Sequence, residues 1–137
     1  MRIALVTPYG REHRNGNWHT AARWARFLRE AGHAVRVQVE WDRRATDLML
    51  ALHARRSFAS IRAFADRFPS HPLIVTLTGT DLYRDIHENQ DAQQALELAH
   101  RLIVLQDRGV DELPVHLAAR TRVIYQSSPD ISRPPSP

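Results

Sequence analysis

The sequence predicts an α/β fold, in which a doubly wound parallel sheet of six strands carries helices on both faces. Six short apolar runs alternate with stretches of helical periodicity, which is the pattern of parallel strands joined by helical crossovers. Several runs are apolar at nearly every position, as expected of strands that are buried on both faces. The length of 137 residues fits one domain with a substantial core.

The first half of the chain contains three of the predicted strands. Residues 3–7 form an apolar run that a proline ends, and residues 35–39 alternate valine with polar residues. The run at 48–52 fits a strand or a helix by periodicity, and its short length favours a buried strand. A helix is expected over 20–31, with Gly32 as its left-handed cap. Its inward residues are expected to be Ala21, Trp24, Ala25, Phe27, Leu28 and Ala31, and its outward residues Arg23, Arg26, Arg29 and Glu30.

The second half contains the other three strands, again separated by helical segments. The strands are expected at 73–77, 102–105 and 123–125, and the helical segments at 57–68, 82–86, 91–101 and 107–120. Asp91 is expected to cap the third of these helical segments, and Pro114 to divide the fourth into two pieces. Residues 127–137 are rich in proline and serine and are expected to be a linker, so the domain spans 1–126.

Composition and charge argue against several classes of protein. All 19 basic residues are arginine, and the net charge is +4, but they are spread among acids rather than clustered as in a nucleic-acid site. Cysteine is absent, so no disulfide or thiolate metal site is expected. No apolar stretch has the length of a membrane span, and the N-terminus leads directly into a strand, so a cytoplasmic protein is expected. Six other histidines lack the spacing of metal ligands and are expected at the surface. They are His13, His33, His71, His87, His100 and His116.

The chemically informative residues follow the predicted strands, where ligands bind in open parallel sheets. Asn15–Thr20 joins a glycine turn to a helix start, whose free N–H groups and dipole favour an anion. The third strand is followed by a histidine and two arginines, and the fourth by a second glycine turn. The candidate binding residues are Gly16, Asn17, His19, His53, Arg55, Arg56, Thr78, Gly79, Thr80 and Asp81. No residue is assigned as catalytic.

Each of these residues also has a purely structural interpretation. Gly16 belongs to neither a P-loop nor a dinucleotide-binding fingerprint, so it could mark a plain turn. His53 could be a satisfied, semi-buried histidine, and Asp81 could be a helix N-cap. Arg55 and Arg56 could be a solvated helix start, although arginine there opposes the helix dipole and a bound anion would relieve that cost.

Three segments together resemble the N-terminal half of glycosyltransferases with the GT-B fold. They are the helix end and strand Leu28–Val35, the strand and turn Leu73–Asp81, and the last strand Arg122–Ser127. The resemblance covers nearly the whole chain and implies a Rossmann-like domain that forms the acceptor side of a cleft. It also implies a second domain outside this chain, which carries most of the nucleotide-sugar site. Alone, the chain is then expected to be an incomplete enzyme that could self-associate through the exposed cleft edge.

Three blocks are similar, more narrowly, to the selenosugar synthases of selenoneine biosynthesis. They are Asn15–Ala21, Leu52–Ser57 and Thr78–Ile86. This resemblance implies transfer of a sugar from UDP-N-acetylglucosamine or UDP-glucose to selenophosphate, with release of UDP and no cofactor or metal. It places Gly16 and Asn17 near the donor diphosphate or the transferring sugar, His19, Arg55 and Arg56 on the selenophosphate, and Thr80 and Asp81 on sugar hydroxyls.

One departure from the family concerns Thr78, which stands where many GT-B relatives carry histidine. Selenophosphate is already anionic, so it would need an anion clamp more than a base. Two other functions remain open: a sugar- or nucleotide-binding module without catalysis, and a glycosyltransferase with an ordinary alcohol acceptor. A receiver domain is disfavoured, because no acidic cluster follows the first strand and no aspartate follows the third.

Overall fold

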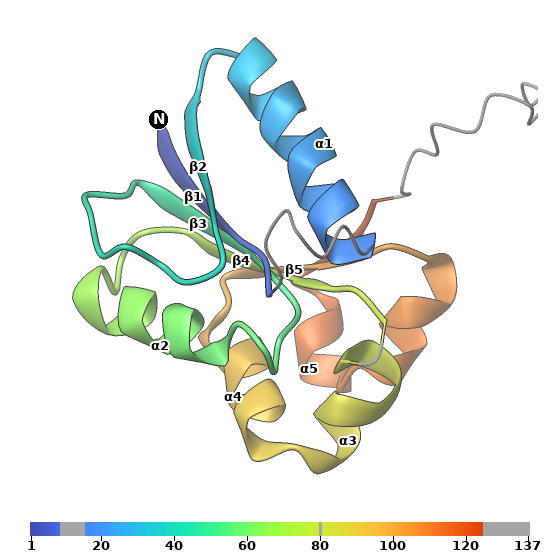
Figure 1. Cartoon of the computed structure of the whole chain (residues 1–137). Helices are drawn as coiled ribbons and strands as arrows, with labels where there is room; N and C mark the ends of the chain where they lie inside the picture. The colour runs from blue at the N-terminus through green and yellow to red at the C-terminus, as the bar shows by residue number, and fades with distance from the viewer. Residues whose placement is uncertain (9–15, 80, 125–137) are drawn as a thin grey trace, which may run out of the picture.

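The computed structural model describes residues 1–8, 16–79 and 81–124, which form a six-stranded, all-parallel sheet with interleaved helices (Figure 1). The strands are β1 (Arg2–Val6), β2 (Ala34–Gln38), β3 (Leu48–Leu52), β4 (Leu73–Leu77), β5 (Arg101–Val104) and β6 (Thr121–Val123). The helices are α1 (Gly16–Glu30), α2 (Phe58–Arg67), the π-helical η2 (Asp81–Asp85), α3 (Ile86–Glu88), α4 (Gln90–Leu98), the 3₁₀-helical η3 (Asp107–Glu112) and α5 (Val115–Ala118). The predicted α/β, Rossmann-like fold class is confirmed.

The strand order is β2-β1-β3-β4-β5-β6, which determines where a ligand would lie. β1 pairs with β2 on one side and with β3 on the other, so the direction of winding reverses between β1 and β3. Open α/β sheets bind ligands at such a switch point, beyond the carboxyl ends of the strands. The segments that follow β1, β3 and β4 all begin at this edge.

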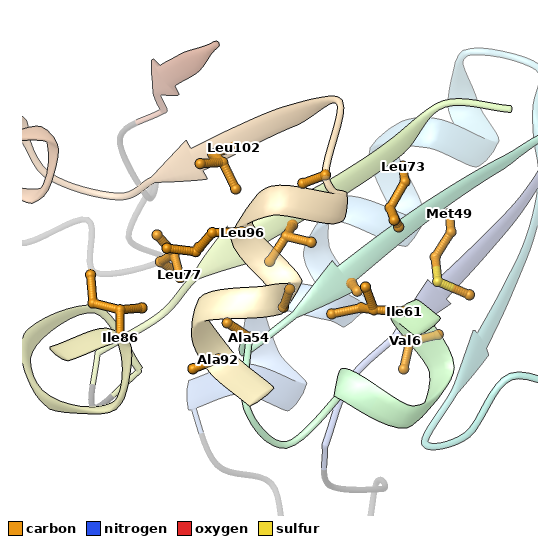
Figure 2. Packing of buried hydrophobic residues seen from close by; sticks show 14 of the residues in the cluster. Val6, Met49, Ala54, Ile61, Leu73, Leu77, Ile86, Ala92, Leu96 and Leu102 are labelled. Atoms are coloured by element: carbon orange, nitrogen blue, oxygen red, sulfur yellow. The ribbon is translucent and has the colours of Figure 1, made fainter. Parts of the chain in front are cut away.

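The two faces of the sheet are covered unequally. One face packs against α2, α4 and α5 and holds the larger core, which includes Ile61, Leu77 and Leu102 (Figure 2). The other face carries α1 alone, and its smaller core includes Leu5 and Leu50 (Figure 1). Helices therefore lie on both faces as predicted, but within the described residues one face has a single helix.

Helix α1 begins at Gly16, four residues before the predicted start at 20. The prediction was tied to the first buried residues, which are Thr20 and Ala21. The first turn lies outside that pattern, because Asn17 and Trp18 are only half-buried and His19 is exposed. The predicted C-terminal cap is confirmed, since Gly32 has φ of 99° and a Schellman motif closes the helix. Its two hydrogen bonds run from the N–H of Gly32 to the Arg29 carbonyl (3.0 Å) and from the N–H of His33 to the Leu28 carbonyl (3.1 Å).

The buried face of α1 is narrower than predicted. Phe27 and Ala31 were expected to face inward, but both are exposed, Phe27 by 47%. Arg23 was expected to face outward, but it is half-buried, and its Nη1 has no hydrogen-bond partner among the described residues. The reason is that α1 covers only one part of its sheet face, so the flank that carries Phe27 has no layer opposite it.

Boundaries in the second half also differ from the predictions, and α4 ends at Leu98 rather than at 101. The cap of α4 is Asn89, whose Oδ1 accepts the N–H of Ala92 at 2.9 Å, and Asp91 lies in the first turn. Asn89 takes the cap because its backbone is extended, which is the conformation that a capping residue needs. β6 runs from Thr121 to Val123 rather than from 123 to 125. Pro114 divides the region before it as predicted, with η3 on one side and α5 on the other.

His71 was predicted at the surface, but it is half-buried. Its ring stacks on Phe68 with the centroids 4.6 Å apart, and its Nδ1 lies 2.9 Å from the Thr46 carbonyl oxygen. In the part of the chain that the structure describes, no helix has both the length and the apolar character needed to cross a membrane. The predicted linker, 127–137, lies outside the described residues, as does His13.

Candidate functional site

The turn after β3 is held in an unusual backbone conformation. His53 has φ of 75°, a left-handed value that is strained for a residue with a side chain. Its N–H donates to the Thr76 carbonyl at 2.9 Å, which continues the β3–β4 ladder into the turn. The Ser57 hydroxyl donates to the Leu52 carbonyl at 2.6 Å and closes the turn against the strand. These hydrogen bonds therefore hold His53 in a strained backbone conformation at the carboxyl edge of the sheet, where a ligand is expected.

The turn after β4 is organised by the fully buried carboxylate of Asp81. Its Oδ1 accepts the N–H groups of Thr78 at 2.8 Å, Gly79 at 2.9 Å and Leu82 at 3.0 Å. Its Oδ2 accepts the N–H of Ala54, in the turn after β3, at 3.0 Å. Gly79 has φ of 155°, which favours glycine over other residues. A single carboxylate thus joins the two turns, which makes Asp81 more than the simple helix cap considered from the sequence.

A second buried carboxylate, Asp85, was not among the predicted site residues. It is 3% exposed, and its Oδ2 accepts a hydrogen bond from Arg55 Nε at 2.9 Å. The same oxygen lies 3.9 Å from His53 Nε2, and Oδ1 lies 3.5 Å from Arg84 Nε. The available signal was its position four residues after Asp81, in a predicted helical turn. That turn is π-helical, a rare geometry that often marks functional sites.

The hydrogen bonds around His53 determine its protonation. Nδ1 accepts the N–H of Arg56 at 3.1 Å, so the proton of the neutral ring lies on Nε2, the nitrogen that faces Asp85. Burial lowers the pKa of His53; the charges of Asp81 and Asp85 oppose this effect, and those of Arg56 and Arg55 reinforce it. His53 is therefore neutral at neutral pH, and its Nδ1 is already occupied, so it is poorly placed to act as a base.

Asp85 is ionised, which makes its contact with Arg55 an ion pair. Burial alone would raise the pKa of Asp85, but the hydrogen bond and charge of Arg55 lower it below its ordinary value, helped by His53 and Arg84. The Arg55 side chain keeps 32% of its surface exposed while Nε is engaged. It lines an open polar groove of about 470 Å³ together with Arg84, Asp85, Glu88 and Asn89.

Two buried threonine hydroxyls at the same edge have no hydrogen-bond partner among the described residues. Thr76 lies in β4 opposite Leu52 of β3, and Thr7 directly follows β1 on the other side of β3. An unsatisfied buried hydroxyl costs about 1–3 kcal/mol. In the described part of the chain, these two hydroxyls are unpaired polar groups near the carboxyl ends of β1 and β4.

The predicted site residues fall into three groups. The structure brings together five of them: His53, Arg55, Thr78, Gly79 and Asp81. Gly16, Asn17 and His19 lie in the first turn of α1, not in the turn before it, and His19 is exposed with its ring 5.3 Å from that of Trp18. Arg56 is exposed in the turn after β3, and Thr80 lies outside the described residues.

The site and fold define a Rossmann-like parallel α/β domain in which the buried Asp85 and His53 and the partly exposed Arg55 form a cluster at the carboxyl edge of the sheet. Among the residues that the structure describes, no group of three or more histidine, aspartate or glutamate side chains could hold a metal ion. No protein-family model matches the chain, and a search of curated proteins finds no match.

Proposed function

We propose that this domain is the acceptor-side half of a glycosyltransferase that transfers a sugar from UDP-N-acetylglucosamine or UDP-glucose to selenophosphate. The proposal starts from the resemblance of three sequence blocks to selenosugar synthases. The observation that supports it best is the juxtaposition of two of those blocks, the turns that follow β3 and β4. Asp81 joins these turns, and Asp85 holds the partly exposed Arg55 beside them.

In this proposal Arg55 binds the anionic acceptor. Asp85 engages Nε and so orients the guanidinium, whose remaining nitrogens form the two-point donor that suits a phosphate-type oxyanion. Arg84 adds positive charge on the same groove. The exposed His19, in the first turn of α1, would approach from the side of β1, where the helix dipole also favours an anion.

The reaction needs little acid–base chemistry from the protein. The selenium of the acceptor donates its electron pair to the anomeric carbon, a C–Se bond forms, and the C–O bond to UDP breaks with its electron pair on the departing phosphate. No proton leaves the acceptor, so the site needs no base. This agrees with threonine rather than histidine at position 78, and with His53, whose Nδ1 already accepts a hydrogen bond. Fixed dipoles at the site would stabilise the charge that develops.

Asp81 receives a positioning role in this proposal. Its carboxylate is fully buried and accepts four backbone N–H groups, so it holds the turn that faces the sugar instead of contacting the hydroxyls itself. Thr78 and Gly79, both half-buried, are then the parts of this turn that remain for contact with a ligand.

Calorimetry with phosphate, thiophosphate and selenophosphate tests the acceptor assignment. The wild-type chain should bind these anions, and Arg55→Ala should weaken binding at least about tenfold, equivalent to about 1.4 kcal/mol. Arg55→Lys keeps the charge beside Asp85 but loses the two-point donor, so it should fold normally and bind with intermediate affinity. Arg62→Ala is the matched control, because Arg62 is an exposed arginine on α2 whose partner is Asp66.

Two results would overturn the proposal. One is equal anion affinity in wild type, Arg55→Ala and Arg55→Lys. The other is tight binding of UDP or a UDP-sugar with no binding of any phosphate-type anion, which would favour the nucleotide-binding module instead.

A further inference from the structure

An apolar groove lies on the sheet face that carries α1 alone. It has a volume of about 250 Å³, and its lining is formed by Trp24, Phe27, Leu28, Leu50, Ile103 and Ile124. Phe27 is 47% exposed and Ile124 43% exposed. Parallel sheets are ordinarily covered on both faces, so an open apolar groove on this face indicates a missing layer.

The geometry of the groove's far wall follows from the pairing of the last strands. The N–H of Ile124 donates to the Val104 carbonyl at 2.9 Å, which extends the β5–β6 ladder by one residue and directs Ile124 to the groove. Arg122 is in register with Ile103, and in-register residues of parallel strands lie on the same face. Arg122 is exposed and therefore places a positive charge beside the groove.

We propose that the residues that follow Ile124 in this same chain, 125–137, fold back and occupy the groove. The segment starts at the groove's own wall, and at about 3.3 Å per residue it reaches roughly 40 Å. Its sequence contains Pro134-Pro135-Ser136-Pro137, a P-x-x-P pattern that favours the polyproline II conformation. Such segments bind grooves lined by aromatic side chains, as Trp24 and Phe27 line this one.

The size of the groove supports the same occupant. The groove's volume accommodates a few side chains, which suits prolines and Ile131 better than a complete helix. A polyproline II segment loses little conformational entropy on docking, because its backbone is restricted beforehand.

A single spin label tests this inference, because the chain contains no cysteine. A nitroxide on Ser136→Cys should broaden the NMR signals of the Trp24 indole N–H and of the Leu50 and Ile103 methyl groups. Phe27→Asp should abolish the broadening, since it places a charge in the groove at an exposed position that the fold tolerates. Val115→Asp is the matched control: Val115 is 91% exposed on α5, on the opposite face, and its variant should keep the broadening.

An experiment on mixed samples shows whether the groove is occupied by the chain's own segment or by the same segment of a second copy. Spin-labelled protein without isotope enrichment is added to isotope-enriched protein without the label. The proposal expects no broadening of groove signals in this mixture, because the contact is within one chain. Broadening in the mixture, or no broadening of groove signals in the singly labelled chain, would overturn it. Neither outcome depends on the glycosyltransferase proposal.

Discussion

Two aspartates four positions apart, Asp81 and Asp85, have the same side chain but different surroundings and therefore different roles. Asp81 and Asp85 are both buried in η2, but Asp81 accepts four backbone N–H groups, whereas Asp85 faces Arg55, Arg84 and His53. The first can organise a turn, and the second can orient a cation. The sequence pointed to Asp81 alone, because a residue after a glycine turn is conspicuous and a residue in the following helix is not.

A single residue, His53, also leads to a prediction about how stability depends on pH. Burial lowers the pKa of His53 in the folded chain, while unfolding restores its ordinary value of about 6.5. The stability that comes from neutral His53 is therefore complete above about pH 6.5 and is lost as the pH falls below it. His53→Asn removes this titration and tolerates the left-handed backbone, so its free energy of unfolding should fall less steeply between about pH 7 and pH 5.

Urea denaturation at several pH values measures this difference. His116→Asn is the control, because His116 is an exposed histidine on α5, away from the turn after β3. Parallel pH profiles for wild type and His53→Asn would show that His53 does not resist protonation in the fold.

At the scale of elements, η3 packs closely against its neighbours at Gly109. A Cβ added to Gly109 would lie 2.8 Å from Val104 Cβ and 2.9 Å from Leu82 Cδ2. Glycine at this position allows η3 to pack directly against β5 and η2. This contact matters for the site, because η2 carries both Asp81 and Asp85.

We expect Gly109→Ala to lower the free energy of unfolding by about 1–3 kcal/mol through overpacking. Chemical denaturation gives this value directly. In the Gly109→Ala background, Leu82→Ala should lose less stability than it does in wild type, because removal of Cδ2 relieves the contact. Strictly additive losses would indicate that the effect of Gly109→Ala does not arise from this contact.

At the scale of the whole molecule, stability is concentrated on one face of the sheet. Phe64 is fully buried there, with ring contacts of 5.4 Å to Trp41 and 5.7 Å to Phe68. Phe27 is on the opposite face and is half-exposed. The same substitution should therefore have different consequences on the two faces.

Phe64→Ala should lower the free energy of unfolding by about 3–5 kcal/mol, since it opens a cavity in the larger core. Phe27→Ala should lower it by less than about 1 kcal/mol, as expected of a surface position. Thermal or urea denaturation of the two variants tests the contrast. Similar losses for both would mean that the groove face contributes to the core more than its exposure indicates.

The sequence by itself determined the fold class, the succession of strands and helices, the cap at Gly32 and the segments that meet at the switch edge. These features depend on periodicity and on neighbouring residues, which a linear sequence displays directly. Only the tertiary structure decided which partners the buried charges take, because Ala54 and Asp81 are 27 positions apart and Arg55 and Asp85 are 30 apart. It also decided the left-handed backbone of His53 and the open face beside α1, since both depend on which layers pack against the sheet and not on local sequence.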